Sequence, residues 1–88
     1  MFEPTHGCPH LQPLELMQKA EGLAKAKGLD ADQRLKSSVL VIELVPEHMF
    51  KCIKTTLTWS GSAWQVSNVE RLLEAGNETA CEVLTVQG

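Results

Sequence analysis

The stretch SVLVIELV, residues 38–45, decides the fold of this chain. It is rich in β-branched residues, and apart from Ser38 and Glu43 every side chain in it is apolar. Successive side chains of a strand point to opposite faces, so this segment would present apolar groups to both faces of a sheet. Such a two-sided pattern is typical of a central strand. Pro46, which cannot donate a hydrogen bond to a strand ladder, marks its end.

A helix is predicted upstream of this strand, in PLELMQKAEGLAKAKG, residues 13–28. Its apolar residues recur at three- and four-residue spacing and would form one face: Leu16, Met17, Ala20, Leu23 and Ala24. Pro13 suits the first helical turn, and Gly28 suits the stop. Asp30 and Gln33 have the spacing of a capping box, so one further helical turn is expected there.

Two more strands are predicted downstream of the central one. Residues 49–59 alternate, with Ile53, Leu57 and Trp59 on one face. The Gly-centred SGS at residues 60–62 would form a hairpin loop. A strand that returns from this loop would bring Trp64 close to Trp59, as an aromatic pair across the ladder.

The segment SNVERLLEAGNE, residues 67–78, allows two interpretations. Ser67 and Glu70 have capping-box spacing, which favours a short helix at about residues 68–75. The length of residues 63–74, however, matches the strand before it and the strand expected after it, which favours a long third strand. We prefer the strand, bulged near Ser67 and Asn68 and turning at Ala75-Gly76-Asn77.

We therefore predict an α+β fold, with one N-terminal helix packed on a four-stranded antiparallel sheet in an α-β-β-β-β meander. The fourth strand would cover residues 78–87. The single small domain would span residues 13–88, because a chain of 88 residues has room for one core. Residues 1–12 contain Pro, Gly and His without periodicity, which is typical of a flexible N-terminal tail.

Charge and composition exclude several function classes. A net charge of −3 lacks the basic excess of a nucleic-acid binder, so binding of nucleic acid is not favoured. No apolar window is long enough to span a membrane, and the N-terminus does not resemble a signal peptide, so we expect a cytoplasmic protein without membrane contact. Three widely spaced cysteines fit reduced thiols better than a disulfide framework. We expect no cofactor.

A candidate metal site lies in the N-terminal segment THGCPH, where His6, Cys8 and His10 place three potential ligands within five residues. A fourth ligand would come from the folded domain: Cys52, Cys81 or His48. The spacing differs from the C-x2-C and H-x3-H pairs of structural zinc sites, and alternate residues of an extended segment point to opposite sides. We favour the interpretation as a solvated tail and keep the metal site as the alternative.

No catalytic residues are predicted. Cys52 and Cys81 lie among apolar neighbours, where cysteine is usually a small buried hydrophobe. His48 is close to Cys52 in sequence, but the pair lacks a third group that would orient the base. The scattered glutamates are typical of solvated strand faces and ends, and a domain of this size has little room for a deep pocket.

The leading hypothesis concerns leftover apolar surface. One helix covers only part of a four-stranded sheet, and exposed apolar patches usually mark an interface. We place the interface at Val39, Val41, Phe50 and Cys52. We predict a small non-enzymatic binding or regulatory protein that acts by protein–protein contact and self-associates as a homo-oligomer through the uncovered sheet face or an edge strand. The alternative is a metal- or redox-responsive protein. A third hypothesis is weak single-stranded nucleic-acid binding by the tryptophan hairpin with three cations: Lys51, Lys54 and Arg71.

Overall fold

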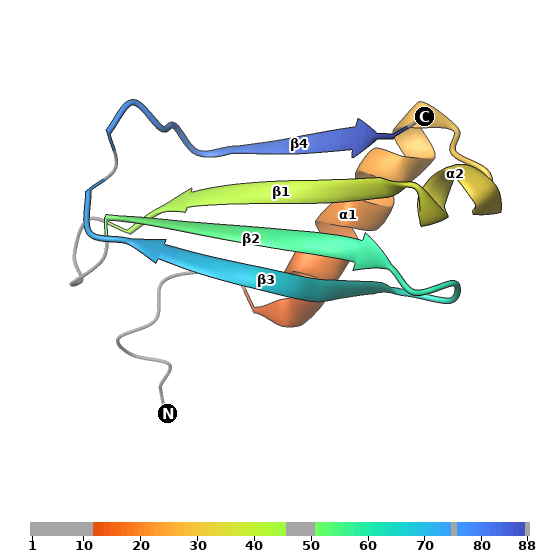
Figure 1. The fold of residues 1–88 in the computed structure, drawn as a ribbon, viewed down its shortest axis with the longest axis horizontal. Helices are drawn as coiled ribbons and strands as arrows, with labels where there is room; N and C mark the ends of the chain where they lie inside the picture. Colours follow the sequence, from red (N-terminus) through yellow and green to blue (C-terminus); the bar gives the residue numbers. More distant parts are fainter. Residues whose placement is uncertain (1–11, 46–50, 75, 88) are drawn as a thin grey trace.

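The computed structural model describes residues 12–45, 51–74 and 76–87 of the chain (Figure 1). In these residues a long helix and a short helix precede four antiparallel strands. The elements are α1 (Pro13–Lys27), α2 (Ala31–Leu35), β1 (Ser37–Leu44), β2 (Cys52–Trp59), β3 (Trp64–Leu72) and β4 (Cys81–Val86). The predicted α+β class, with one long N-terminal helix on a four-stranded antiparallel sheet, is confirmed.

The two ends of α1 are fixed by local hydrogen bonds. Its first turn contains Pro13, and the backbone N–H of Gln12 donates to the Glu15 carboxylate at 3.0 Å. At the other end Gly28 adopts a left-handed conformation with φ 70°, which a residue with a Cβ rarely adopts. The N–H of Leu29 then donates to the carbonyl of Ala24 at 3.1 Å, and this bond closes the helix.

The short helix α2 has the predicted capping box. The Asp30 carboxylate accepts from the backbone N–H of Gln33 at 2.8 Å, and the Gln33 side chain accepts from the N–H of Asp30 at 3.0 Å. The box holds a single helical turn that directs the chain from the end of α1 into β1.

The strand order is β3-β2-β1-β4, which differs from the expected meander in its last connection. The first three strands follow one another as hairpins, whereas β4 returns to the far side of β1, in the order of a Greek key. The chain crosses the end of the sheet between β3 and β4 (Figure 1). This arrangement gives the two-sided apolar β1 a neighbour on each side, and it leaves the mostly exposed β3 at an edge.

A bulge in β3 occurs at Ser67, as predicted. Thr56 pairs with Asn68 and Leu57 pairs with Val66, so Ser67 is the extra residue in the ladder. Its hydroxyl donates to the carbonyl of Thr56 at 3.1 Å. Because the bulge shifts the alternation by one residue, Val66 before it and Val69 after it both point to the α1 side of the sheet.

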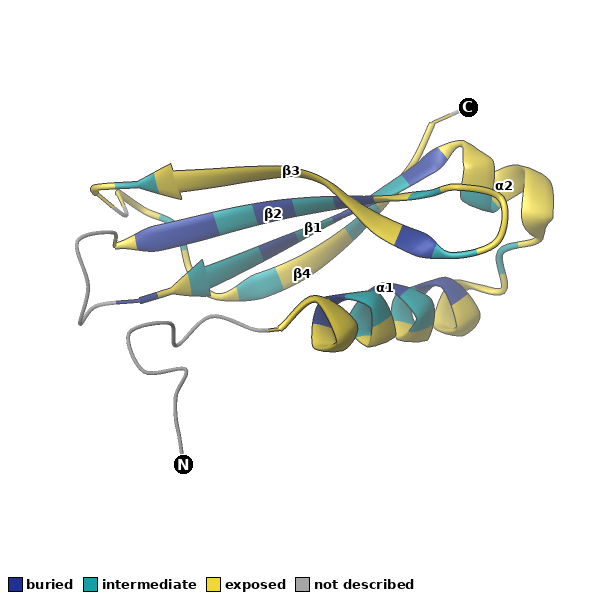
Figure 2. Cartoon of the chain, turned by 90° about the horizontal axis from the view of Figure 1, so that it is seen from below, coloured by how far each residue is buried: buried dark blue, intermediate teal, exposed yellow. Residues whose placement is uncertain are grey.

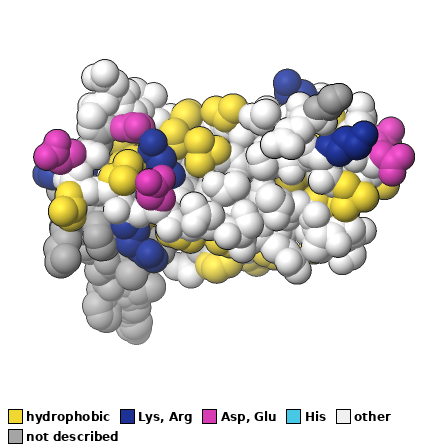
Figure 3. Space-filling view, in the orientation of Figure 1, with side chains coloured by type: hydrophobic (Ala, Val, Ile, Leu, Met, Phe, Trp, Pro, Cys, Tyr) yellow, Lys and Arg dark blue, Asp and Glu magenta, His cyan; other side chains and the backbone are white. Residues whose placement is uncertain are grey.

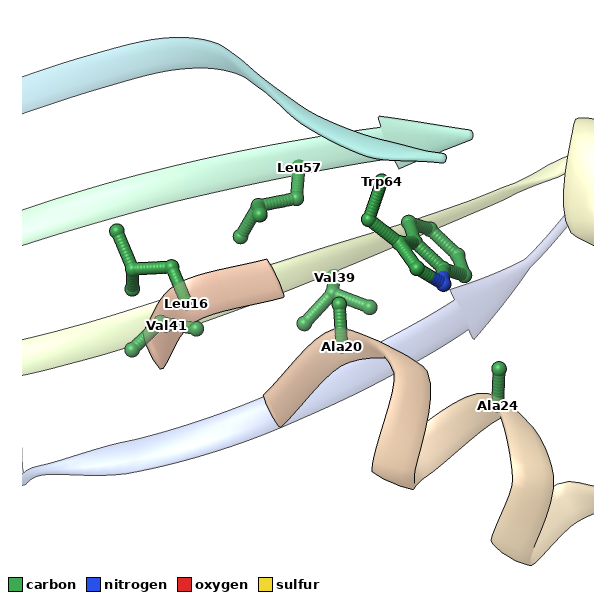
Figure 4. Close-up of a cluster of buried hydrophobic side chains, with 7 residues drawn as sticks. All are labelled: Leu16, Ala20, Ala24, Val39, Val41, Leu57 and Trp64. Carbon is green, nitrogen blue, oxygen red and sulfur yellow. The ribbon is translucent and has the colours of Figure 1, made fainter. Parts of the chain in front are cut away.

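The core lies between α1 and one face of the sheet (Figure 2). It contains seven buried side chains: Leu16, Ala20, Ala24, Val39, Val41, Leu57 and Trp64 (Figure 4). Ala20 and Ala24 are fully buried, and such small residues allow the helix to approach the valines of β1 closely. Neither helix in the described residues combines the length and the apolar character needed to cross a membrane.

Candidate functional site

The face of the sheet opposite α1, called the open face below, carries an apolar patch. Figure 3 views this face and shows hydrophobic side chains over β1 and β4. The open-face patch consists of Leu40, Ile42, Leu44, Cys81 and Val83. Leu44 is 43% exposed and Val83 is 46% exposed. The predicted excess of apolar surface is therefore present on the half of this face that β1 and β4 form.

The other half of the open face, formed by β2 and β3, is polar. Its side chains are mainly threonine, glutamine and asparagine: Thr56, Thr58, Gln65 and Asn68. Near the start of β2, Lys54 donates to Glu78 at 2.9 Å, so a residue of the β3–β4 connection is held against the sheet. This hydrogen bond lowers the pKa of Glu78 and raises the pKa of Lys54.

The structure corrects the predicted interface residues. Val39 and Val41 are 0% and 2% exposed and pack under α1, so they belong to the core and are not surface residues. Val39 pairs with Leu57, which places both on the α1 side. The prediction placed these two valines on the same sheet face as Cys52. That placement would require the pairing of β1 with β2 to be shifted by one residue. Cys52 does lie on the open-face side but is fully buried, and Phe50 lies outside the described residues.

The free edge of β4 adjoins the open-face patch. The backbone N–H of Gln87 donates to the carbonyl of Lys36, so this pair faces β1. Bonded and non-bonded pairs alternate in an antiparallel ladder. The residues whose backbone groups point away from β1 are therefore Glu82, Leu84 and Val86. Among the described residues these N–H and C=O groups have no strand partner, so they form a row that another strand can complete.

The two edge strands differ in how well they are protected. The β3 edge contains the bulge at Ser67 and the charged residues Glu70 and Arg71, and such features discourage pairing. The β4 edge has a single charged residue, Glu82, whose carboxylate accepts from the Lys19 ammonium of α1 at 2.9 Å. With its charge paired inside the molecule, β4 is the edge that is open to association.

A polar cluster joins α1, α2 and the β2–β3 hairpin. Arg34 donates to both carboxylate oxygens of Glu21, at 2.6 and 3.0 Å, and the Trp64 indole N–H donates to Glu21 at 3.0 Å. The Arg34 guanidinium carbon lies 4.9 Å from the centre of the Trp59 ring. The hydrogen bond from Arg34 lowers the pKa of Glu21, desolvation opposes this effect, and the bond from Trp64 adds to it.

Sequence reasoning missed this cluster because it links residues far apart in the chain. A signal was present, since a buried tryptophan usually needs an acceptor for its N–H. Every polar group of the cluster has a partner within the protein, and its hydrogen bonds hold α2 and the hairpin against α1.

The tryptophans were predicted to pack as an aromatic pair, and this is confirmed. Trp59 and Trp64 meet edge to face, with ring centroids 5.4 Å apart. Trp64 is only 2% exposed, so it offers no stacking surface. The cations of the nucleic-acid hypothesis are also separated, because Lys54 points to the open face and Arg71 to the α1 side. The described residues therefore give this hypothesis no support.

Cys52 and Cys81 are both free thiols. Burial raises the pKa of the Cys52 thiol, and the nearby Glu78 carboxylate raises it further, so the reactive thiolate form is disfavoured. Within residues 12–45, 51–74 and 76–87, no three His, Cys, Asp or Glu side chains are placed to hold a metal ion. The predicted ligands His6, Cys8 and His10, and the candidate His48, lie outside the described residues, so the metal site stays a prediction.

A second surface feature lies on the α1 side, beside the core. A cavity of about 430 Å³, called the α1–β3 groove below, separates the N-terminal half of α1 from β2 and β3. The apolar side chains that line it include Leu16, Met17, Ile53, Val66 and Val69. Arg71 also lines it. Nothing in the sequence pattern pointed to this groove, because it depends on the angle at which α1 crosses the sheet.

Comparison of the chain with protein families, with curated proteins and with solved structures finds no significant match. The surfaces described above are therefore the basis for any functional proposal: the open-face patch with the β4 edge, and the α1–β3 groove.

Proposed function

We propose that this chain is a small non-catalytic binding protein that acts through protein–protein contact and self-associates by pairing β4 with β4 of a second copy. The observation that carries the proposal is the unpaired backbone row of β4 beside the open-face patch. Pairing would satisfy these backbone groups and bring apolar side chains of the two copies together.

The alternation along β4 restricts how two copies can pair. A two-fold axis normal to the sheet makes the two strands antiparallel, with each residue contacting the same surface of its partner. A register centred on Val83 or on Leu84 places the outward-facing residues of both copies opposite each other. In either register the two open-face patches lie side by side, and the four strands of each copy continue into one sheet.

Charge and shape favour a second copy as the partner of β4. The Glu82 carboxylate is paired with Lys19, so two β4 strands approach without repulsion between unpaired charges. The remaining side chains of the strand are apolar or small, and β-branched residues pack well across a strand pair. A six-residue edge buries less surface than a standard protein interface, so we expect a weak, concentration-dependent dimer.

A non-catalytic role and a reducing compartment such as the cytoplasm form part of the proposal. The buried Cys52 thiol has a raised pKa, which is the opposite of what a nucleophile needs. The Glu21 cluster is used for packing. Cys52 and Cys81 exist as separate free thiols, which suits a reducing environment.

The test is sedimentation of the wild-type chain from about 1 µM to about 1 mM, the affinity range expected for a small interface. Val83→Lys should weaken the dimer at least tenfold, because two ammonium groups would then lie beside each other at the two-fold axis. Val66→Lys on β3 is the matched control, since Val66 is similarly exposed, at 40% against 46%. A wild-type chain that stays monomeric throughout, or equal weakening by both variants, would overturn the proposal.

A further inference from the structure

We infer that the α1–β3 groove binds an amphipathic anion, namely an alkyl chain that ends in a carboxylate, with the chain against the apolar lining and the carboxylate at Arg71. This site lies on the α1 side of the sheet and is separate from the β4 edge used in self-association. The inference goes beyond the proposed function and does not depend on it.

The groove has the size and the lining of a ligand site. Its volume of about 430 Å³ falls within the range of about 300 to 1,000 Å³ that is typical of small-molecule pockets. Val66 and Val69 point into it, yet they remain 40% and 38% exposed. The bulge at Ser67 turns both valines to the α1 side, where they line the groove together with Leu16 and Met17 of α1. Figure 1 shows that α1 crosses the sheet obliquely.

Arg71 supplies the charge that selects an anion. It follows Val69 by two residues on β3, so both side chains lie on the α1 side, and both line the groove. Three other cations of the described chain are paired with carboxylates: Lys19 with Glu82, Arg34 with Glu21, and Lys54 with Glu78. The remaining lysines of the described residues do not line the groove. Arg71 has no such partner among the described residues. A guanidinium can bind a carboxylate through two parallel hydrogen bonds.

The acidic group in the same cross-strand row is Glu43, which pairs with Ile53 while Ile53 pairs with Arg71. Two strand spacings separate Glu43 from Arg71, which is about 10 Å. A ligand carboxylate at Arg71 would therefore lie much closer to the guanidinium than to Glu43.

The lining favours an alkyl chain over a peptide. A peptide brings a donor and an acceptor for every residue, and each needs a partner when it leaves water. Apart from Arg71, few polar residues line the groove, namely Thr55 and Gln65, and the Gln65 side chain lies on the open face. The edge of β3, which could pair with a peptide backbone, is interrupted by the bulge at Ser67. An alkyl chain has no hydrogen-bond donors or acceptors that need partners in the groove.

Titration of the full chain with three probes of equal chain length tests the inference: decanoate, decanol and decyltrimethylammonium. The two ions are kept below their micelle concentrations, and decanol is kept below its solubility limit. Trp64 lines the groove, so its fluorescence reports binding, and calorimetry measures the affinity. We expect decanoate to bind best and the cation worst. Arg71→Gln should weaken decanoate about tenfold, the loss of a charged hydrogen-bond pair, and leave decanol unchanged. Arg71→Lys should restore part of the preference for decanoate.

Val69→Asp and Val83→Asp form a matched pair, because the two valines are similarly exposed on opposite faces, at 38% and 46%. Val69→Asp should abolish decanoate binding, and Val83→Asp should leave it intact. Equal affinity for decanoate and decanol in the wild type and in Arg71→Gln would overturn the inference. So would the absence of decanoate binding up to about 1 mM. An acidic peptide that displaces decanoate and binds more tightly would reassign the groove to a protein partner.

Discussion

The two faces of the sheet differ although the same strand, β1, is apolar toward both. On the α1 side Val39 and Val41 are buried against two alanines of the helix. On the open face Leu40 and Ile42 are only partly covered. The comparison teaches that strand alternation identifies two apolar faces but does not reveal which one the helix covers. Here the smaller side chains face the helix, which allows a close approach of α1 to the sheet.

The largest expected effect comes from adjacent residues of β2 that point to opposite faces. Leu57 is fully buried in the core, whereas Thr56 lies on the polar half of the open face. Leu57→Ala should lower the free energy of unfolding by about 2 to 5 kcal/mol through lost burial and a cavity. Thr56→Ala should cost less than about 1 kcal/mol. Urea denaturation of both variants measures the difference, and similar losses would show that both faces are packed in solution.

A smaller effect on stability is expected at Glu21, which accepts hydrogen bonds from Arg34 and Trp64 on the α1 side of the sheet. Glu21→Gln should lower the free energy of unfolding by about 1 kcal/mol at pH 7, a modest value because the side chain is 31% exposed. Glu82→Gln, which removes the more exposed pair with Lys19, serves as the control and should cost less than about 0.5 kcal/mol.

The Glu21 effect should also depend on pH. The hydrogen bond from Arg34 lowers the pKa of Glu21 below its ordinary value of 4.5. The stabilisation is therefore fully present above the pKa of the unfolded chain and is lost as the pH falls through the lower pKa of the folded state. We expect the difference in stability between wild type and Glu21→Gln to shrink as the pH falls below about 4.5 and to vanish below the lower pKa of the folded state. A difference that stays constant down to pH 3 would contradict the assignment.

Chemical labelling of Cys52 and Cys81 tests the open face without any substitution. Cys52 is fully buried, and its pKa is raised by burial, whereas Cys81 is partly exposed in the open-face patch. Alkylation by iodoacetamide, followed by peptide mass spectrometry, should label Cys81 at least about a hundredfold faster than Cys52, which reacts only after local opening. Equal rates would mean that the end of β2 opens readily.

Much of the fold could be predicted from local patterns. Pro13 and Gly28 bound the helix, Asp30 and Gln33 form the capping box, and the bulge falls at Ser67. Each of these features depends on residues a few positions apart, so the chemistry that decides it is visible in the sequence. The choice of a strand over a helix after Ser67 was also correct, because strand length outweighed one capping-box match.

The features that sequence reasoning missed depend on long-range geometry. In the structure β4 lies beside β1, which therefore has a neighbour on each side. The alternation of apolar and polar residues is compatible with several strand orders, so it could not predict this one. The prediction that Val39 and Val41 lie at an interface was wrong, because a shift of one residue in the pairing of β1 with β2 exchanges the two faces. The Glu21 cluster and the groove require the angle of α1 on the sheet, which no short pattern encodes.

The bulge at Ser67 has a consequence for how this strand tolerates genetic change. Substitutions at Ser67 leave the count of residues intact, so Val69 and Arg71 keep their side of the sheet. Loss of the single codon for Ser67 would remove the extra residue and restore regular alternation, and Val66, Val69 and Arg71 would keep their faces. The groove would keep its apolar wall and its cation. A three-nucleotide deletion is therefore tolerated better at the bulge than elsewhere in β3, where it would exchange the faces of the residues after it.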